Sequence, residues 1–214
     1  MEINNELKDN KDIVVDYLSN GSPIFQSKKL YTFTSDSIEL AKSVKNTNIN
    51  ILVDLCAGSG IVGLEVMAQK NVNKLYLVEV QTSLAELSKL TADQNTEREK
   101  IVVLNIDAIN SPSVIGLGLV DVVTINPPYF KKGSGKISSN KVRAIARMED
   151  NASLHDFIEV AKKLLKPGGE LYMVHIYDRL VEIKNELAAQ GFILMEEKVL
   201  NGKLKRVIIH AKKQ

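Results

Sequence analysis

From about residue 49 to the C-terminus, short apolar runs alternate with stretches that carry helical periodicity. Strands separated by helices of about 10 to 15 residues are typical of βαβ units, in which neighbouring strands run parallel. The sequence therefore predicts an α/β fold with a mainly parallel sheet. The predicted strands are 51–55, 75–80, 101–106, 119–126, 170–175, 192–200 and 205–211, and the predicted helices are 61–70, 83–95, 153–165 and 178–190.

Three regions depart from this alternation. The last two predicted strands have no helix between them, and Asn201-Gly202 is a hairpin signal, so we expect the sheet to end in an antiparallel pair. Residues 1–48 form an N-terminal extension with a predicted helix at 35–44. Residues 130–152 form a polar stretch that is longer than an ordinary connection. Long loops at the carboxyl ends of parallel strands are usually functional.

A glycine-rich loop follows the first predicted strand. Residues 58–63 read G-S-G-I-V-G and fit G-x-G-x-x-G, a pattern of dinucleotide-binding loops. Asp54, however, stands four residues before Gly58. A pyrophosphate requires positive potential at a helix N-terminus, and a carboxylate there would repel it. S-adenosylmethionine carries a sulfonium and an ammonium but no phosphate, so the loop favours that cofactor, with Gly58 and Gly60 allowing close approach of the backbone.

Two further acids lie at the ends of the next two predicted strands, Glu79 closing the second and Asp107 following the third. Glu79 lies 19 residues after Gly60, where a carboxylate can accept hydrogen bonds from both hydroxyls of a ribose. Asp107 could accept a hydrogen bond from an adenine amino group. The Glu79 position is shared with NAD-binding folds and does not discriminate by itself, and each acid could instead be a loop residue or a helix cap. With Asp54, these acids would form one line along the sheet edge.

The fourth predicted strand ends in Asn126-Pro127-Pro128-Tyr129. The asparagine side-chain oxygen and the Pro127 carbonyl can accept two hydrogen bonds from one exocyclic amine, and the prolines stiffen the turn. Tyr129 offers a ring face for stacking a planar base or amide. Such an arrangement would aim the nitrogen lone pair at a methyl sulfonium for an in-line displacement driven by positioning. A simple proline turn is the alternative, but behind a D-x-x-x-G-x-G loop we interpret the motif as a methyl-transfer site.

Together the two motifs resemble the class I S-adenosylmethionine-dependent amino-methyltransferases over roughly residues 30–214. More narrowly, the chain is similar to the bacterial tRNA1(Val) adenosine-37 N6-methyltransferases. Residues 26–36 resemble that family's N-terminal cofactor motif, Phe130 matches its trailing phenylalanine, and residues 146–149, A-R-M-E, resemble its A-R-x-E element. Met148 stands where histidine is common in the family, and Cys56 stands where methyltransferases often have glycine.

The resemblance implies a Rossmann-like fold, a seven-stranded and mainly parallel sheet with an antiparallel last strand. It divides the chain into an N-terminal extension, 1–48, with a cofactor-contacting segment, and a class I methyltransferase domain, 49–214. The implied cofactor is S-adenosyl-L-methionine. The residues implied to contact it are Phe33, Asp36, Asp54, Ala57, Gly58, Gly60, Glu79, Asp107 and Asn126. Those implied in catalysis, by holding the target amine, are Asn126, Pro127, Pro128 and Tyr129.

The N-P-P-Y motif does not choose the substrate, because enzymes that methylate adenine N6 share it with enzymes that methylate a glutamine amide in release factors. Release-factor enzymes typically carry a larger helical N-terminal domain, and only about 50 residues precede Asp54 here. DNA enzymes usually add a separate recognition domain. We therefore expect a tRNA adenine-N6 methyltransferase, with a glutamine N5-methyltransferase, an rRNA or DNA adenine-N6 methyltransferase and a non-catalytic binding module as alternatives.

Charge favours a nucleic acid partner only locally. The formal net charge is +2, so any contact with nucleic acid must come from clustering. Two basic clusters occur: a C-terminal one, and an acid-free one between the fourth strand and the next helix, where phosphate contacts would suit a splayed base. The C-terminal cluster is Lys198, Lys203, Lys205, Arg206, Lys212 and Lys213, and the predicted RNA-binding residues of the other are Lys131, Lys132, Lys136, Lys141, Arg143 and Arg147. Either cluster could instead be a solvated lysine face.

The remaining expectations concern where and with what the protein works. A single cysteine and three scattered histidines offer no metal site, so we expect catalysis without a metal. No stretch of 18 apolar residues is present, and the first residues are unlike a secretory signal. We expect a cytoplasmic monomer that modifies tRNA.

Overall fold

The computed structural model describes residues 12–30, 32–127, 129, 152–202 and 204–214. Within them, the main sheet has the strand order β5-β4-β3-β6-β7-β9-β8. All neighbours are parallel except β9, which is antiparallel to both β7 and β8. The strands are β3 (Asn48–Leu55), β4 (Asn71–Val78), β5 (Ile101–Leu104), β6 (Val120–Ile125), β7 (Leu165–Ile176), β8 (Phe192–Leu200) and β9 (Arg206–Lys213). The predicted α/β class, the parallel sheet and the antiparallel end are confirmed.

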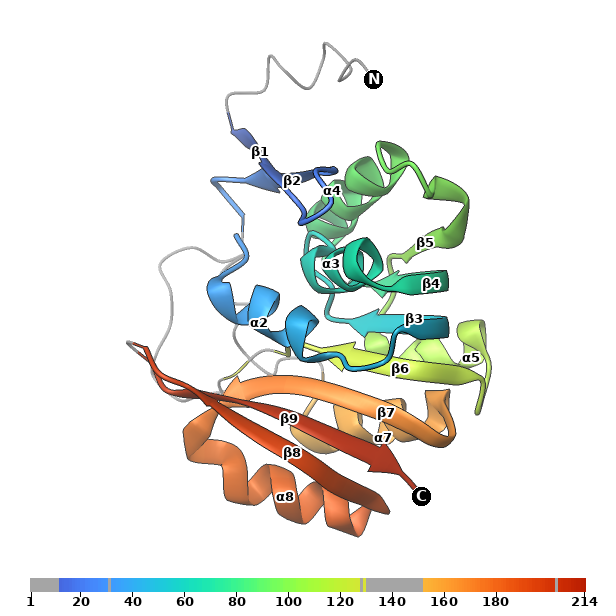
Figure 1. Cartoon of the computed structure of the whole chain (residues 1–214), viewed down its shortest axis with the longest axis vertical. Coiled ribbons are helices and arrows are strands. Elements are labelled where there is room, and N and C mark those ends of the chain that lie inside the picture. The colour runs from blue at the N-terminus through green and yellow to red at the C-terminus, as the bar shows by residue number, and fades with distance from the viewer. Residues whose placement is uncertain (1–11, 31, 128, 130–151, 203) are drawn as a thin grey trace.

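Helices cover both faces of this sheet (Figure 1). On one face lie α2 (Ser35–Ser43), α3 (Ile61–Gln69) and α4 (Thr82–Asp93), and on the other lie α5 (Ser111–Ile115), α7 (Leu154–Leu164) and α8 (Leu180–Ala189). Short 3₁₀ turns, η1 (Arg98–Lys100), η2 (Ala108–Asn110) and η3 (Tyr177–Arg179), precede β5, α5 and α8. Because strand side chains alternate between faces, Leu52 packs with α2 and α3 whereas Val53 packs with α7.

The sequence of α7 shows why these boundaries form. Ser153 accepts a hydrogen bond from the backbone N–H of Asp156, and the Asp156 carboxylate accepts one from the backbone N–H of Ser153, which is a capping box. Leu154, Phe157 and Leu164, at helical spacing, are all buried against the sheet. The predicted helix at 153–165 therefore matches α7 together with its N-cap residue, Ser153.

A two-stranded antiparallel sheet of β1 (Ile13–Tyr17) and β2 (Pro23–Ser27) precedes α2 and was not predicted. Its turn contains Asn20-Gly21, and Gly21 has a φ of +82°, a conformation that glycine adopts without strain. Phe25 of β2 is fully buried against Leu84 and Leu87 of α4. The hairpin therefore covers the outer side of α4.

Gly63 in α3 sets how closely that helix approaches the sheet. A Cβ atom at this position would lie 2.8 Å from a methyl group of Leu77, 2.9 Å from one of Leu75 and 3.1 Å from Cβ of Asp54. All three neighbours are buried side chains of β3 and β4. The third glycine of the loop pattern therefore serves helix–sheet packing in this chain.

We predict that Gly63→Ala lowers the free energy of unfolding by up to about 2 kcal/mol, because overpacking of the core, which typically costs about 1–3 kcal/mol, outweighs the better helix propensity of alanine, which is worth ~1 kcal/mol. Urea unfolding at neutral pH should show a lower midpoint with an unchanged slope. A midpoint equal to or above that of the parent would show that the two leucines move aside at no cost.

Candidate functional site

The carboxyl ends of β3, β4 and β6 meet at one edge of the sheet, with β3 between the other two. From β3 the chain continues to β4 and β5 on one side, and it returns on the other side through β6 and β7. The strand order therefore reverses between β3 and β6. Crevices at such switch points, outside the carboxyl ends of parallel strands, are where open α/β sheets bind ligands. The described site residues cluster around this point.

The loop from β3 to α3 is built from left-handed backbone conformations. Cys56, Gly58 and Gly60 have φ values of +58°, +59° and +88°. The Gly60 N–H donates to the carbonyl of Ala57 at 2.8 Å, and a Cβ at Gly60 would lie 2.9 Å from a methyl group of Leu77. At Gly58, by contrast, a Cβ would meet nothing within 4 Å. The loop is thus packed on the Gly60 side and open at Gly58, where a ligand can approach the backbone.

Asp54 lies beneath this loop with only 1% of its surface exposed. Its Oδ1 accepts a hydrogen bond from the Thr124 hydroxyl at 2.7 Å, and its Oδ2 accepts one from the Gly63 N–H at 3.0 Å. Burial raises the pKa of this carboxyl to about 7, and the charge of Glu79 acts in the same direction, against the two hydrogen bonds. The predicted cofactor residue Asp54 therefore ties the glycine loop and the start of α3 to β6.

Glu79 and Asp107 also contact backbone groups at this edge. Glu79 accepts hydrogen bonds from the Gly58 N–H at 2.8 Å and the Gln81 N–H at 2.9 Å, and burial raises its pKa. Asp107 accepts from the Ile109 N–H and caps η2. Burial and the charges of Glu79, Asp54 and Asp107 all raise the pKa of the Cys56 thiol. The three predicted acids thus surround one loop.

Asn126 and Tyr129 form a hydrogen-bonded group with the start of α2. The Tyr129 hydroxyl donates to Asn126 Oδ1 at 2.6 Å, and Asn126 Nδ2 donates to the Ser37 hydroxyl at 3.0 Å. Tyr129 is 7% exposed, so its ring is enclosed in this structure. Holding a target amine with Asn126, as the sequence suggests, requires its oxygen to accept that amine in addition to or in place of the tyrosine. The catalytic roles of these two residues stay predictions.

Arg206, at the first position of β9, joins this group from the far end of the chain. Its Nε lies 2.9 Å from Asp36 Oδ2, an ion pair rather than a directed hydrogen bond. Its guanidinium carbon lies 5.3 Å from the centre of the Tyr129 ring. Asp36 also accepts a hydrogen bond from the Thr34 hydroxyl. The predicted cofactor residue Asp36, in the first turn of α2, is therefore linked through Arg206 to the turn that carries the N-P-P-Y motif, here called the motif turn, and the predicted cofactor residue Phe33 lies two residues before α2.

His175, near the end of β7, was not singled out in the sequence. It is fully buried, and its Nδ1 accepts a hydrogen bond from the Ile176 N–H at 2.8 Å, so the proton lies on Nε2. Burial, together with the charge of Arg179, lowers the pKa of His175 to about 3. Its ring centre lies 5.4 Å from that of Tyr129. The imidazole therefore supports the tyrosine as a neutral ring.

The structure describes Pro127 but not Pro128, and the predicted RNA-binding residues Lys131, Lys132, Lys136, Lys141, Arg143 and Arg147 also lie outside the described residues. Within the described ranges, no three His, Cys, Asp or Glu side chains are grouped so that they could hold a metal ion. No helix in that same part of the chain has the length and apolar character to span a bilayer.

Comparison with known proteins gives a family for most of the chain. Residues 32–190 match the family described as Methyltransferase small domain. The chain is 28% identical to a tRNA1(Val) (adenine(37)-N6)-methyltransferase of Porphyromonas gingivalis, over 62% of this chain and 52% of that protein. It is 32% identical to a release factor glutamine methyltransferase of Bifidobacterium longum, over 61% of this chain and 50% of that protein. The chain thus spans about half the length of these relatives.

Solved structures show the same fold. A tRNA m1G37 methyltransferase of M. jannaschii superposes with a TM-score of 0.69 at 16% identity, over 96% of this chain and 58% of that one. A predicted O-methyltransferase of Agrobacterium tumefaciens gives 0.64 at 20% identity, over 83% and 80%. The two differ in the atom that they methylate, as their names state, so this likeness concerns the architecture and not the substrate.

We predict that Asp54→Asn changes how stability depends on pH. The folded-state pKa of Asp54, about 7, lies above its ordinary value of 3.8. The folded parent therefore binds more protons than the unfolded chain in this window, and its stability falls as pH rises from about 4 to about 7. Asparagine has the same shape and does not ionise. The variant should therefore gain a few kcal/mol relative to the parent across this window.

Urea unfolding of both proteins at several pH values between about 4 and 8 measures this difference. Asp93→Asn, at an exposed position in a surface ion pair with Arg98, serves as the control for the loss of one carboxylate. A difference between Asp54→Asn and the parent that stays constant with pH would show that Asp54 is ionised throughout the window.

Proposed function

We propose that this chain, which belongs to the methyltransferase small domain family, transfers a methyl group from S-adenosylmethionine to N6 of an adenosine in tRNA. The family confirms the methyltransferase and the cofactor that the sequence predicted. The adenosine acceptor, with position 37 of a valine tRNA as the specific target, is our proposal. It rests on the group formed by Asn126, Tyr129 and Ser37 beside the glycine loop, and on the relative of that name.

The residues around the glycine loop fit this cofactor. The open side of Gly58 leaves room for a ligand against the backbone, and the buried carboxylate of Asp54 supplies negative potential, which suits a cationic methionine part. The Glu79 oxygens each accept one backbone N–H, and a carboxylate oxygen has a second lone pair for a ribose hydroxyl. Asp107 would face the adenine, Ala57 and Gly60 the methionine part, and Phe33 and Asp36 the outer side. When bound, the cofactor supplies an electrophilic methyl group.

The target amine is held by the motif turn in this proposal. Asn126 Oδ1 and the Pro127 carbonyl accept its two N–H groups, which orients the nitrogen lone pair toward the methyl carbon. The nitrogen–carbon bond forms as the carbon–sulfur bond breaks, and the amine proton then leaves to water. The chain needs no strong base for this step. In agreement with that, the nearest imidazole, His175, is buried with a lowered pKa and is not placed to gain a proton at neutral pH.

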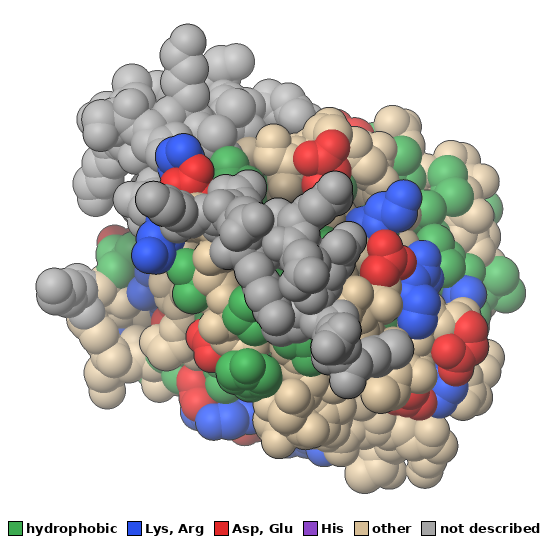
Figure 2. Space-filling model, turned by 90° about the horizontal axis from the view of Figure 1, so that it is seen from above, with side chains coloured by type: hydrophobic (Ala, Val, Ile, Leu, Met, Phe, Trp, Pro, Cys, Tyr) green, Lys and Arg blue, Asp and Glu red, His purple; other side chains and the backbone are tan. Residues whose placement is uncertain are grey.

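A glutamine N5-methyltransferase acting on a release factor is the second candidate, because a relative of that name is 32% identical and the chemistry of its planar amide is the same. What favours RNA is the basic run from Lys131 to Arg147, with six cations and no acid. The described surface shown in Figure 2 carries acidic and basic side chains next to one another. RNA binding would therefore depend on local sites, not on the overall charge.

We predict that the purified protein, given cofactor with a labelled methyl group, labels total tRNA and not rRNA or a release factor, and that nucleoside analysis finds N6-methyladenosine. Asn126→Ala should reduce turnover by about 100-fold or more, because loss of its bond misaims the amine. Cofactor affinity, measured by calorimetry, should stay within a few-fold of the parent. Label in a glutamine of the release factor would establish the second candidate instead.

We predict that Glu79→Ala weakens cofactor binding by about 2–4 kcal/mol, the value of two hydrogen bonds to a carboxylate. Calorimetry without substrate measures this affinity, and thermal unfolding without cofactor checks that the glycine loop survives. Glu86→Ala, at an exposed position on α4, removes the same charge and should change the affinity little. Equal affinity in the parent and Glu79→Ala would rule out the ribose assignment.

A further inference from the structure

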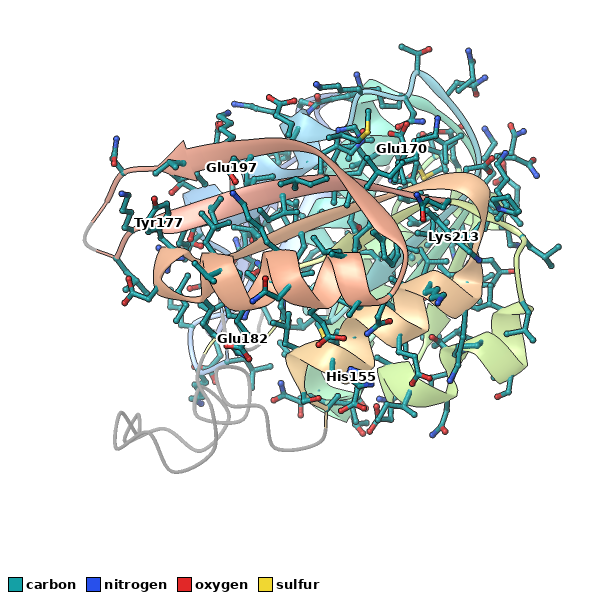
Figure 3. All side chains as sticks on the ribbon, turned by 90° about the horizontal axis from the view of Figure 1, so that it is seen from below. His155, Glu170, Tyr177, Glu182, Glu197 and Lys213 are labelled. Atoms are coloured by element: carbon teal, nitrogen blue, oxygen red, sulfur yellow. The ribbon has the colours of Figure 1, made fainter. Side chains whose placement is uncertain are left out.

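The basic residues around β8 and β9 do not form one surface. Lys198 pairs with Glu39 of α2, and Lys213 donates to the carbonyls of Lys162 and Leu165. In β9, Arg206 pairs with Ile176 and Lys212 pairs with Glu170 of β7. The two ends of β9 therefore lie at opposite ends of the strands of the sheet. Figure 3 shows this separation, with Tyr177 and Lys213 labelled at opposite ends of the strands. Among the described cations of this group, only those at positions 205 and 206 lie at the edge that carries the motif turn.

Lys205 is held over an aromatic ring at that edge. Its Nζ lies 3.7 Å from the centre of the Tyr177 ring, and its carbonyl accepts a hydrogen bond from the Tyr177 N–H at 3.0 Å. Lys205 is exposed, and within the described part of the chain no carboxylate forms an ion pair with it. A lysine over a tyrosine keeps its full charge and loses part of its freedom. It is therefore preorganised for an anion.

Arg206 repeats the arrangement one residue later. It lies over the Tyr129 ring and beside Asp36, and its Nη1 donates to the Leu204 carbonyl. Tyr129 is bonded in turn to Asn126, the residue proposed to hold the target amine. The pair of cations thus adjoins the proposed acceptor position. The charge of Arg206 is balanced by Asp36, its ion-pair partner at the start of α2.

We propose that Lys205 and Arg206, held over Tyr177 and Tyr129, form a binding site for a backbone phosphate of the unpaired RNA strand that carries the target base. This inference rests on the proposed function. The phosphates of a flexible, unstacked strand are bound by cations along its path, and the Tyr177 and Tyr129 rings hold these two cations in place. A splayed adenosine whose amine is held by Asn126 would bring its own phosphates to this edge. The Lys205 ammonium, which is not neutralised, provides the main contact.

Binding of an unmodified valine tRNA transcript, measured against salt concentration, tests this site. One phosphate contact on a single strand contributes about 0.7 to the log–log salt slope, which amounts to roughly fivefold in affinity at 0.1 M salt. Lys205→Ala should show both losses. Lys212→Ala is the matched control, because it removes the same charge from an exposed position at the opposite end of β9. It should leave the slope and the affinity within error of the parent.

Two further variants define the chemistry. Lys205→Arg keeps a cation that can lie over Tyr177 and should restore the parent's affinity and slope. Arg206→Gln, made alone in the parent, should also lower the salt slope by about 0.7. Thermal unfolding of Arg206→Gln checks that the fold survives when Asp36 loses its partner.

The outcomes separate this inference from the proposed function. If the parent binds and methylates the transcript while Lys205→Ala and Lys212→Ala behave alike, the phosphate site is wrong and the proposed function stands. If the parent methylates only the glutamine of a release factor, the proposed function fails and this site falls with it. A loss confined to Lys205→Ala and Arg206→Gln, with cofactor affinity unchanged, is the result we expect.

Discussion

The carboxylate of Asp54 is the interaction on which the site depends. It joins β3, on which it lies, to Thr124 of β6 and to the Gly63 N–H at the start of α3. These are the strands between which the sheet order reverses, and the helix that the glycine loop opens. With only 1% of its surface exposed, the group cannot be hydrated, so its hydrogen bonds must be made within the protein. One buried acid thus holds together the two strands at the switch point and the glycine loop beside them.

The motif turn is held by two parts of the chain that lie far from it in sequence. Ser37, near the start of α2, accepts the Asn126 amide, and Arg206, at the start of β9, lies over Tyr129. Asp36 closes the ring by pairing with Arg206. Because three elements meet at Asn126 and Tyr129, the turn depends on more than its prolines. The segment before β3 therefore contributes to the site through side chains that contact the turn directly.

The sequence predicted the sheet because periodicity and glycine signals are local. The strand predicted at 192–200 is β8, with both ends correct. Most other strand ends differ from the prediction by a few residues, because pairing with the neighbouring strand sets where a strand begins and ends. For example, β7 begins at Leu165, which pairs with Val120 of β6. The predicted acids do surround the glycine loop. The sequence did name Arg206, but only as part of a basic cluster. The places of Ser37, His175 and Arg206 beside the motif turn could not be found in this way, because their neighbours lie up to 89 residues away and no spacing rule links them. The Asn20-Gly21 turn was a local signal that could have revealed the first hairpin.

The charge beneath the loop also explains why the glycine pattern alone misleads. A loop matching G-x-G-x-x-G presents backbone N–H groups, which by themselves favour a phosphate. In this chain, the Gly63 N–H is bonded to Asp54 and the Gly58 N–H to Glu79, so two of the three glycine N–H groups of the pattern already serve carboxylates. Burial raises the pKa of both acids because both sites resist negative charge, and the charge of Glu79 adds to this resistance at Asp54. A cationic ligand relieves that resistance and a pyrophosphate would add to it. The same six-residue pattern therefore suits opposite ligands, according to the acids that accept its N–H groups.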